Sequence, residues 1–492
     1  MKKIFFAYFF ICAAIAYGAI TTQTWTMYVS GAAFWGGIGR DWNGTVYAGL
    51  GNHLTNDNAN SVVYRYNNST NDWTQVMDVK VVSQAAGNWL ALDRPGKIHS
   101  TIKQGLDGKL YFSTHSAFDT DNDLANYPSL FRGGHFYCYD PISGQGRDLS
   151  DPNVGAGHCG LTDLAVATQY NLVYGIGYPY GYMYKQDIRN GDSTFLWATQ
   201  SQVGQVSRVV LEDNYGRFLC PNVTKRFLIY DPVTDSVTFD RFRHNYGTTI
   251  TAAVKSWTGD SIYYIMSEGG DDRIFRYIVS RDTAQFVAYV DSGNTSSFKA
   301  SLALRWDQNK LYIALGNRLV SINALTGARI TEATNLPNPS YGWYGCNGID
   351  RNGDLFFSAA GNRTVMKVSL AQPCAICTQK PKYLDSAYVD SVDNAWRTST
   401  VAESAEKSLS GILTATPNPF NPDVTIVVAG AFRETFPHIM IFDITGRFVA
   451  DLTSQVYQGR VSWNASGMPS GIYIIKAWAG KQALTKAITL IK

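Results

Sequence analysis

The chain repeats one short pattern along most of its length, and this repetition constrains the fold more than any other feature. Each copy has an acidic or glycine-rich turn, a strand of the form L-Y-x-x, a loop, and a second strand ending in tyrosine and a D-P-x-[ST]-like turn. Apolar and polar residues alternate within each copy, which is typical of hairpins of β-strands. Seven copies are present, at residues 43–73, 107–144, 170–188, 215–237, 259–282, 308–327 and 352–370.

A repeat of this size cannot bury the faces of its strands alone, whereas a closed ring of such repeats can. The pattern therefore predicts an all-β fold, a seven-bladed β-propeller, with six or eight blades as alternatives. A strand within residues 24–31 is a candidate to close the ring against the last blade. Composition agrees, because a chain with 44 Gly and 30 Tyr but only 16% charged residues favours short strands and tight turns.

The N-terminus has the pattern of a secretory signal peptide. Lys2 and Lys3 precede an apolar run over residues 4–15, and small residues near Ala16 and Ala19 offer cleavage sites. No later run reaches the roughly 18 apolar residues that cross a bilayer, so we expect no membrane span after signal removal. A formal charge of +3 gives no reason to expect a nucleic acid partner.

Six cysteines remain once Cys12 leaves with the signal peptide, and an even number in an exported protein permits disulfides of undetermined pairing. Cys374 and Cys377 form a C-x-x-C motif. A redox motif or half of a zinc site would give this spacing, but no second C-x-x-C accompanies it. We therefore favour a structural bridge.

The last eighty residues carry several motifs in a fixed order. NPFNP comes first, followed by a strand ending in D-x-x-G-R, then Trp463, G-I-Y and a final basic strand. This order resembles the C-terminal sorting domain of proteins exported by the type IX secretion system, and it is similar to the immunoglobulin-like domain of the flagellar hook-capping family. The resemblance implies a small Ig-like β-sandwich, contact with the bacterial secretion machinery, and delivery to the cell surface or medium.

We therefore expect four segments along the chain. They are a signal peptide at 1–19, a β-propeller at 20–372, a clasp and serine-rich linker at 373–411, and a sorting domain at 412–492. The blade pattern also looks like exported propeller proteins of uncharacterised function. That similarity implies no functional residues.

Propeller geometry sorts the candidate site residues, because the loop before the first strand and the loop after the second strand of each blade share one face. The side chains expected at this rim include four histidines, several aromatic residues, amides and cations. They are Phe34, Trp35, Asn52, His53, His99, His115, His135, His158, Tyr178, Tyr180, Arg208, Asn222, Lys299, Asn317, Trp343, Tyr344 and Asn347.

A channel mouth with this lining suits carbohydrate, because aromatic faces stack on sugar C–H surfaces while amides and imidazoles bond hydroxyls. We therefore predict an exported protein with a glycan-binding face. A polysaccharide lyase is the first alternative, with Arg208 or a metal offsetting a uronate carboxylate and His99, His115, His135 and Tyr178 as candidate acid and base. A protein-interaction platform is the second. A structural role is the other explanation for these histidines, because histidines at strand ends often only form hydrogen bonds with the neighbouring backbone.

Asp119, Asp121 and Asp123 form the one candidate metal site, because alternate carboxylates can converge on Ca²⁺. The EF-hand pattern is absent, which favours an acidic solvated loop over a Ca²⁺ site. Motifs of serine hydrolases, zinc proteases and phosphate-binding loops are missing from the sequence. No other cofactor is predicted.

Overall fold

The structure is a computed structural model. It describes residues 20–492 apart from 28–32, 53, 55–57, 91–94, 116–131, 151–155, 158, 199–205, 223–224, 244–246, 268–271, 292–298, 393, 396–411, 430–437, 445–446, 456–459 and 480–481. The described chain is mostly β-strand with few helices, among them α1 (Val79–Ala85). No helix within these residues combines the length and apolar character that crossing a bilayer requires.

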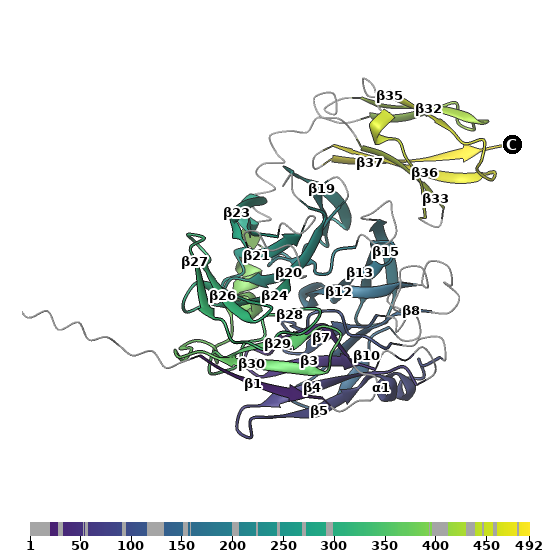
Figure 1. Cartoon of the computed structure of the whole chain (residues 1–492). Helices are drawn as coiled ribbons and strands as arrows, with labels where there is room; N and C mark the ends of the chain where they lie inside the picture. Colours follow the sequence, from purple (N-terminus) through teal and green to yellow (C-terminus); the bar gives the residue numbers. More distant parts are fainter. Residues whose placement is uncertain are drawn as a thin grey trace, which may run out of the picture.

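Most strands form antiparallel groups of four (Figure 1). The first group is β2 (Ala33–Arg40), β3 (Val46–Gly51), β4 (Ser61–Asn67) and β5 (Asp72–Asp78). The second is β6 (Lys103–Gln104), β7 (Leu110–Ser113), β9 (Phe136–Tyr139) and β10 (Gly146–Asp148), beside which β8 (Gly133–Gly134) pairs with β11 (Ala156–Gly157). The third is β12 (Gly160–Ala167), β13 (Leu172–Tyr178), β14 (Tyr182–Asp187) and β15 (Ser193–Ala198).

Two further groups repeat this order. The fourth is β16 (Leu211–Glu212), β17 (Phe218–Pro221), β18 (Arg226–Asp231) and β19 (Ser236–Arg243). The fifth is β20 (Thr249–Lys255), β21 (Ser261–Ser267), β22 (Arg273–Ile278) and β23 (Thr283–Tyr289).

The last two groups are joined in one eight-stranded sheet. One contains β24 (Ala300–Arg305), β25 (Lys310–Leu315), β26 (Arg318–Asn323) and β27 (Arg329–Ala333), and the other β28 (Trp343–Cys346), β29 (Leu355–Ala359) and β30 (Thr364–Ser369). The fourth strand of the latter is β1 (Thr21–Thr26), which pairs antiparallel with β30. The N-terminal strand thus closes the last group, as the sequence suggested, but it begins at Thr21 instead of residue 24.

Each predicted repeat contains the second and third strands of one group, as residues 308–327 contain β25 and β26. The arrangement is propeller-like, because first strands of neighbouring groups lie side by side. β24 pairs in parallel with β28, and Gly39 of β2 forms a parallel bridge with Ile102. The approach at Gly39 requires glycine, since a Cβ there would lie 1.8 Å from the Ile102 carbonyl oxygen.

Hydrophobic cores fill the spaces between neighbouring groups. Phe34, Ile38 and Tyr66 of the first group pack with Phe356 and Val365 of the last, and this cluster seals the ring. Burying each such side chain contributes roughly 1.5–3 kcal/mol.

The segment that follows β30 packs against the strand groups and is held there by hydrogen bonds. Cys374 and Cys377 form a disulfide, as expected of a structural bridge. The Cys374 amide donates to the Asn352 carbonyl at 2.9 Å, and the Lys382 amide donates to the Trp257 carbonyl at 3.0 Å. The other cysteines within the described ranges, Cys138, Cys159, Cys220 and Cys346, are buried thiols.

The C-terminal domain consists of two antiparallel sheets around a core of its own. One sheet is β31 (Ile412–Thr416), β32 (Asp423–Ala429) and β35 (Arg460–Asn464); the other is β34 (Phe448–Asp451), β33 (His438–Asp443), β36 (Gly471–Ala479) and β37 (Gln482–Leu490). Trp463 lies at the centre of the core, with ring centroids 5.7 Å from Phe420 and 5.2 Å from Tyr473.

Candidate functional site

First strands of neighbouring groups lie parallel where they meet, as β24 does with β28. Together they line a common space, here called the channel, because residues of β2 and β20 line the hollows at both of its ends. Residues near the start of these strands line a small hollow of about 20 Å³ at one end, here called the mouth hollow, and the members used below are Trp35, His99, Thr101, Arg208 and Tyr344. Residues towards the ends of the same strands line a larger cavity at the other end. The side-chain chemistry at each end is therefore set by position along the strand.

Four rings form a continuous row beside the mouth hollow. Trp35 stacks on His99 with ring centroids 5.6 Å apart and an interplanar angle of 3°. His99 stacks on His115 at 4.6 Å, and His115 meets Tyr178 at 5.2 Å. The row crosses three neighbouring groups, because Trp35 belongs to the first, the histidines to the second and Tyr178 to the third.

Two glycines let the chain pass close to this row. Gly36 has a φ of +127°, and a Cβ there would lie 2.8 Å from the His99 carbonyl oxygen. A Cβ on Gly160 would lie 2.8 Å from the His115 ring. Both positions therefore exclude a side chain, and substitution at either one would displace a histidine or its backbone.

Cations flank the row on both sides. Arg208 Nη1 lies 3.4 Å from His99 Nδ1, and Lys97 Nζ lies 5.4 Å from the centroid of the Trp35 ring. Burial raises the pKa of Tyr344 to about 12, against the opposing effect of Arg208, so this hydroxyl stays protonated at neutral pH. The mouth is thus basic and aromatic, a combination that suits an anionic ligand with apolar faces.

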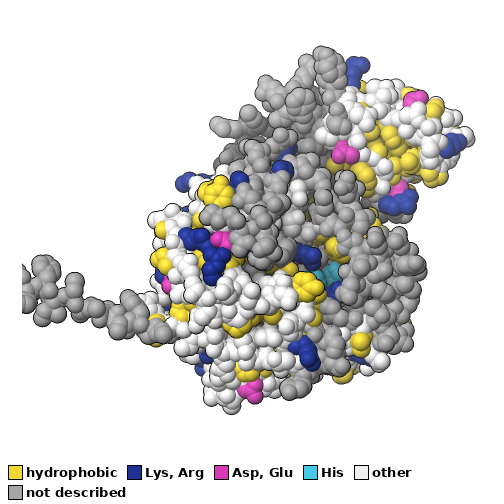
Figure 2. Space-filling model, in the orientation of Figure 1, with side chains coloured by type: hydrophobic (Ala, Val, Ile, Leu, Met, Phe, Trp, Pro, Cys, Tyr) yellow, Lys and Arg dark blue, Asp and Glu magenta, His cyan; other side chains and the backbone are white. Residues whose placement is uncertain are grey.

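The row is accessible at its edges and buried at its centre. His115 is only 4% exposed, whereas Trp35, His99, Tyr178, Arg208 and Tyr344 are half-buried. Figure 2 shows histidine side chains in a recess among hydrophobic and basic side chains. A ligand would therefore contact Trp35, His99 and Tyr178 more readily than His115.

The structure brings together six of the residues predicted at the rim: Trp35, His99, His115, Tyr178, Arg208 and Tyr344. His135 lies elsewhere, because its Nδ1 bonds Asp148 Oδ2 at 2.9 Å in the interior of the second group. Burial would raise the pKa of Asp148, but the neighbouring His135 lowers it overall. The imidazole of His135 thus faces Asp148 of β10 and is not part of the mouth hollow, which differs from the expectation that it shares the rim.

Other predicted residues have structural surroundings. Trp343 is buried and its indole donates to the Gly316 carbonyl at 3.0 Å. Asn222 is buried and accepts from the Arg226 amide at 3.2 Å, and Tyr180 stacks on Tyr182. The remaining placements are Phe34 in the core, Asn52 bonded to the Asn60 amide, Lys299 paired with Asp272, Asn317 bonded through its carbonyl to Leu336, and Asn347 at the opposite end of the channel.

His53, His158, Asp119, Asp121 and Asp123 lie outside the described residues. Within the described ranges, no group of three or more His, Cys, Asp or Glu side chains is placed to hold a metal ion. Sequence reasoning missed Lys97. The spacing in G-K-I-H could have found it, because in extended chain a residue two positions before His99 has its side chain on the same face.

Comparison with known proteins bears on the C-terminal domain. Residues 415–492 match the family of the secretion system C-terminal sorting domain. The domain is a type IX sorting domain. It directs export of the chain across the outer membrane, to the cell surface or the medium.

No curated protein matches the chain. Several solved structures resemble it at low sequence identity. A chain of the mitotic checkpoint complex is 12% identical, covering 75% of this chain and 97% of its own, with a TM-score of 0.48. PorZ, a surface component of the type IX secretion system of Porphyromonas gingivalis, is 16% identical over 95% of this chain and 61% of its own, with a TM-score of 0.46. An extracellular domain assigned to a hybrid two-component system of B. thetaiotaomicron is 11% identical over 94% and 57%, with a TM-score of 0.45.

Proposed function

We propose that this exported protein is a seven-bladed β-propeller followed by an Ig-like sorting domain, and that the propeller binds an acidic polysaccharide at the mouth hollow. The seven four-stranded groups and the closing strand β1 support the blade count. The observation that carries the binding proposal is the row Trp35–His99–His115–Tyr178 flanked by Arg208.

Each part of the row matches a part of a uronate ligand. The half-buried rings of Trp35 and Tyr178 suit the C–H surfaces of pyranose rings, and the imidazole of His99 suits hydroxyls. Arg208 supplies a guanidinium that can pair with the uronate carboxylate in a bidentate manner. Hydrogen bonds to charged groups typically contribute about 1.5–3 kcal/mol, so Arg208 should separate acidic from neutral glycans.

A polysaccharide lyase is the second candidate, favoured by the contact of His115 with Tyr178 next to the Arg208–His99 pair. β-Elimination requires removal of the C5 proton, protonation of the leaving oxygen and neutralisation of the carboxylate. His99 or His115 would act as base, Tyr178 as acid, and Arg208 would hold the carboxylate. His135 has no part in this version, because it faces Asp148.

The test uses the full chain with acidic and neutral polysaccharides, with calorimetry for binding and ultraviolet absorbance for an unsaturated product. We expect acidic glycans to bind, and Arg208→Gln to weaken binding about tenfold or more. Arg281→Gln is the matched control, because Arg281 is exposed on the turn before β23, away from the mouth. Equal binding of neutral and acidic glycans by wild type and both variants would contradict the proposal.

The absorbance trace separates the two candidates. A rise that disappears in Tyr178→Phe, while binding remains, would establish elimination. A flat trace with retained binding would establish a binding domain without lyase activity.

A further inference from the structure

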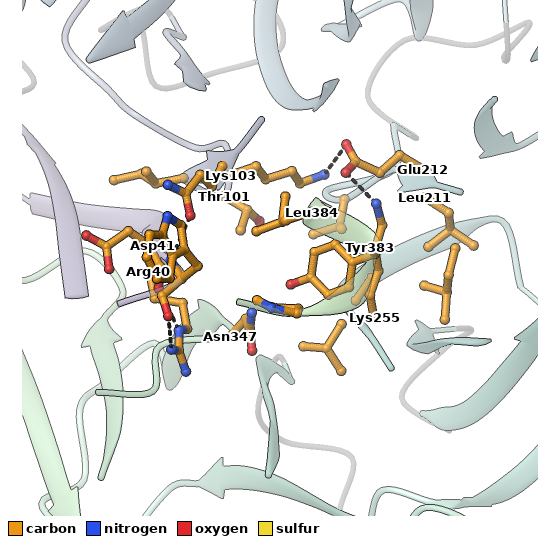
Figure 3. A pocket seen from close by; sticks show the side chains of 18 of the residues that line it. Arg40, Asp41, Thr101, Lys103, Leu211, Glu212, Lys255, Asn347, Tyr383 and Leu384 are labelled. Atoms are coloured by element: carbon orange, nitrogen blue, oxygen red, sulfur yellow. Dashed lines mark hydrogen bonds and ion pairs between the residues drawn. The ribbon is translucent and has the colours of Figure 1, made fainter. Parts of the chain in front are cut away.

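The end of the channel opposite the mouth hollow holds a partly open cavity of about 80 Å³, here called the inner cavity (Figure 3). Its walls are the ends of the first strands, including Arg40, Lys103, Glu212 and Lys255. Its floor is the segment that follows the disulfide, where Tyr383 and Leu384 line the space. The mouth hollow and the inner cavity share only wall positions such as Thr101 and Val209, so their charged side chains are separate sets.

Charged groups face this cavity from inside the protein. Glu212 pairs with Lys255 at 2.6 Å and lies 4.0 Å from Lys103. These three side chains keep 12–17% of their surface accessible although they lie within the channel, and the space they face is the inner cavity. Burial would raise the pKa of Glu212, but Lys255 and Lys103 lower it overall, so the carboxylate is ionised at neutral pH.

The acceptors around the cavity are occupied. Glu212 accepts from Lys255 and from the Val166 amide at 2.6 Å, and Asp41 accepts from the Thr45 amide at 2.9 Å. Asp163, which pairs with Lys103 at 3.3 Å, also accepts from two backbone amides. The carboxylates therefore have little capacity left for a ligand.

Donors remain in excess. Arg40 donates to the carbonyls of Asp41 and Cys377, but its Nη1 is buried without a partner among the described residues. For the Lys255 ammonium, the one acceptor found in the described part of the chain is Glu212, which leaves further N–H groups over the Tyr383 ring, 5.3 Å away. Burial lowers the pKa of Arg40 to about 10, which still leaves it charged at neutral pH.

The walls around these donors are apolar. The guanidinium of Arg40 lies 5.2 Å from the centroid of Trp306, and the Trp306 indole donates to the backbone carbonyl of Lys255 at 3.0 Å. Leu211, Val254 and Ile262 complete the wall. A cavity of about 150 Å³ holds benzene, so this one admits a body of only a few heavy atoms.

We propose that the inner cavity binds a small monocarboxylate, with its carboxylate at the Lys255 ammonium and its alkyl part against the apolar wall that includes Trp306. Acetate, propionate and lactate fit this description. The inference is independent of the proposed function, because Arg208 and the ring row lie in the mouth hollow.

Isothermal titration calorimetry of the full chain tests this, with propionate titrated through the millimolar range and propionamide as the uncharged isostere at equal ionic strength. We expect saturable binding of propionate and none of propionamide. Lys255→Met should weaken propionate binding about tenfold or more, because it removes a charge-assisted donor. Lys310→Met is the matched control, since Lys310 also pairs with a glutamate, Glu332 at 3.0 Å, but lies outside the cavity.

Absence of saturable propionate binding by wild type would overturn the proposal, and so would equal affinity in Lys255→Met. If Lys255→Met fails to fold, magnetisation transfer from protein aromatic protons to the propionate methyl group in the wild type decides the question. Magnetisation transfer would support a propionate bound against Trp306. Absence of transfer would contradict the proposal. Retained propionate binding in Arg208→Gln would separate this site from the glycan site.

Discussion

The two ends of the channel are built from the same strands but differ in the groups that their cations contact. At the mouth hollow, the cations Arg208 and Lys97 adjoin rings, and a stacked row of aromatic and imidazole groups dominates. At the inner cavity, the lysines adjoin carboxylates, and Glu212 lies between two of them. The difference shows that in a ring of this kind, chemistry depends on where a residue falls along the strand more than on which group it belongs to.

The middle of the channel joins the two ends, and its disruption should have the largest effect. Asp163 is fully buried and accepts from the amides of Thr101 and Val210, both at 3.0 Å, and from Lys103. Asp163→Ala leaves a buried cation and two amides without this partner, so we expect a loss of about 3–5 kcal/mol in the free energy of unfolding. Chemical denaturation measures it. The exposed Asp72→Ala should change stability by less than about 1 kcal/mol, and a similar loss in both variants would contradict the assignment.

The mouth should lose ligand affinity without losing stability. Arg208→Gln should weaken acidic glycan binding by about 1.5–3 kcal/mol, since a charged hydrogen bond is removed. Its free energy of unfolding should stay within about 0.5 kcal/mol of wild type. Paired calorimetry and denaturation check both values. A large stability loss with unchanged affinity would assign Arg208 a structural role instead.

The inner cavity should respond to acid in a way that the mouth does not. Burial would raise the pKa of Glu212, but the lysines lower it below the ordinary value of 4.5. A carboxyl with a lowered pKa contributes stability above its unfolded pKa, and this is lost as the pH falls through the folded pKa. Wild type should therefore lose more stability than Glu212→Gln as the pH falls below 4.5. Unfolding curves measured at several pH values would show parallel profiles if this is wrong.

The smallest effect should come from Lys97 at the edge of the mouth. Lys97 is buried and its ammonium lies over Trp35, so it would act on a ligand through this ring. Such contacts contribute about 0.5–1 kcal/mol at exposed sites and about 2 kcal/mol when desolvated. Lys97→Gln should weaken acidic glycan binding about threefold, in a salt-dependent manner. Glycan affinities measured at low and high salt test this prediction. A loss of affinity as large as that of Arg208→Gln would contradict the expectation that Arg208 contributes more to binding than Lys97.

Sequence reasoning located the second and third strands of every group, because alternation and turn residues are local signals. It also placed Trp35, His99, His115, Tyr178, Arg208 and Tyr344 near one another, since they begin first strands or end second strands. The expected placement of His135 fails because its orientation depends on Asp148, a tertiary partner.

The inner cavity was not predicted. Lys103, Glu212 and Lys255 look like ordinary charged residues at strand ends. They share a cavity with Tyr383, which lies far along the chain and packs against the ends of the first strands. Long-range packing of this kind leaves no periodic signal in the sequence.

The closing strand β1 has a kinetic consequence. Thr26 pairs with Thr364, more than three hundred positions later. The first strand of the fold therefore cannot pair until one of the last strands has been synthesised. Loop closure over this distance costs about 5 kcal/mol in chain entropy. The ring therefore forms late and slowly in folding, and its β1–β30 seam is the natural place for it to open first.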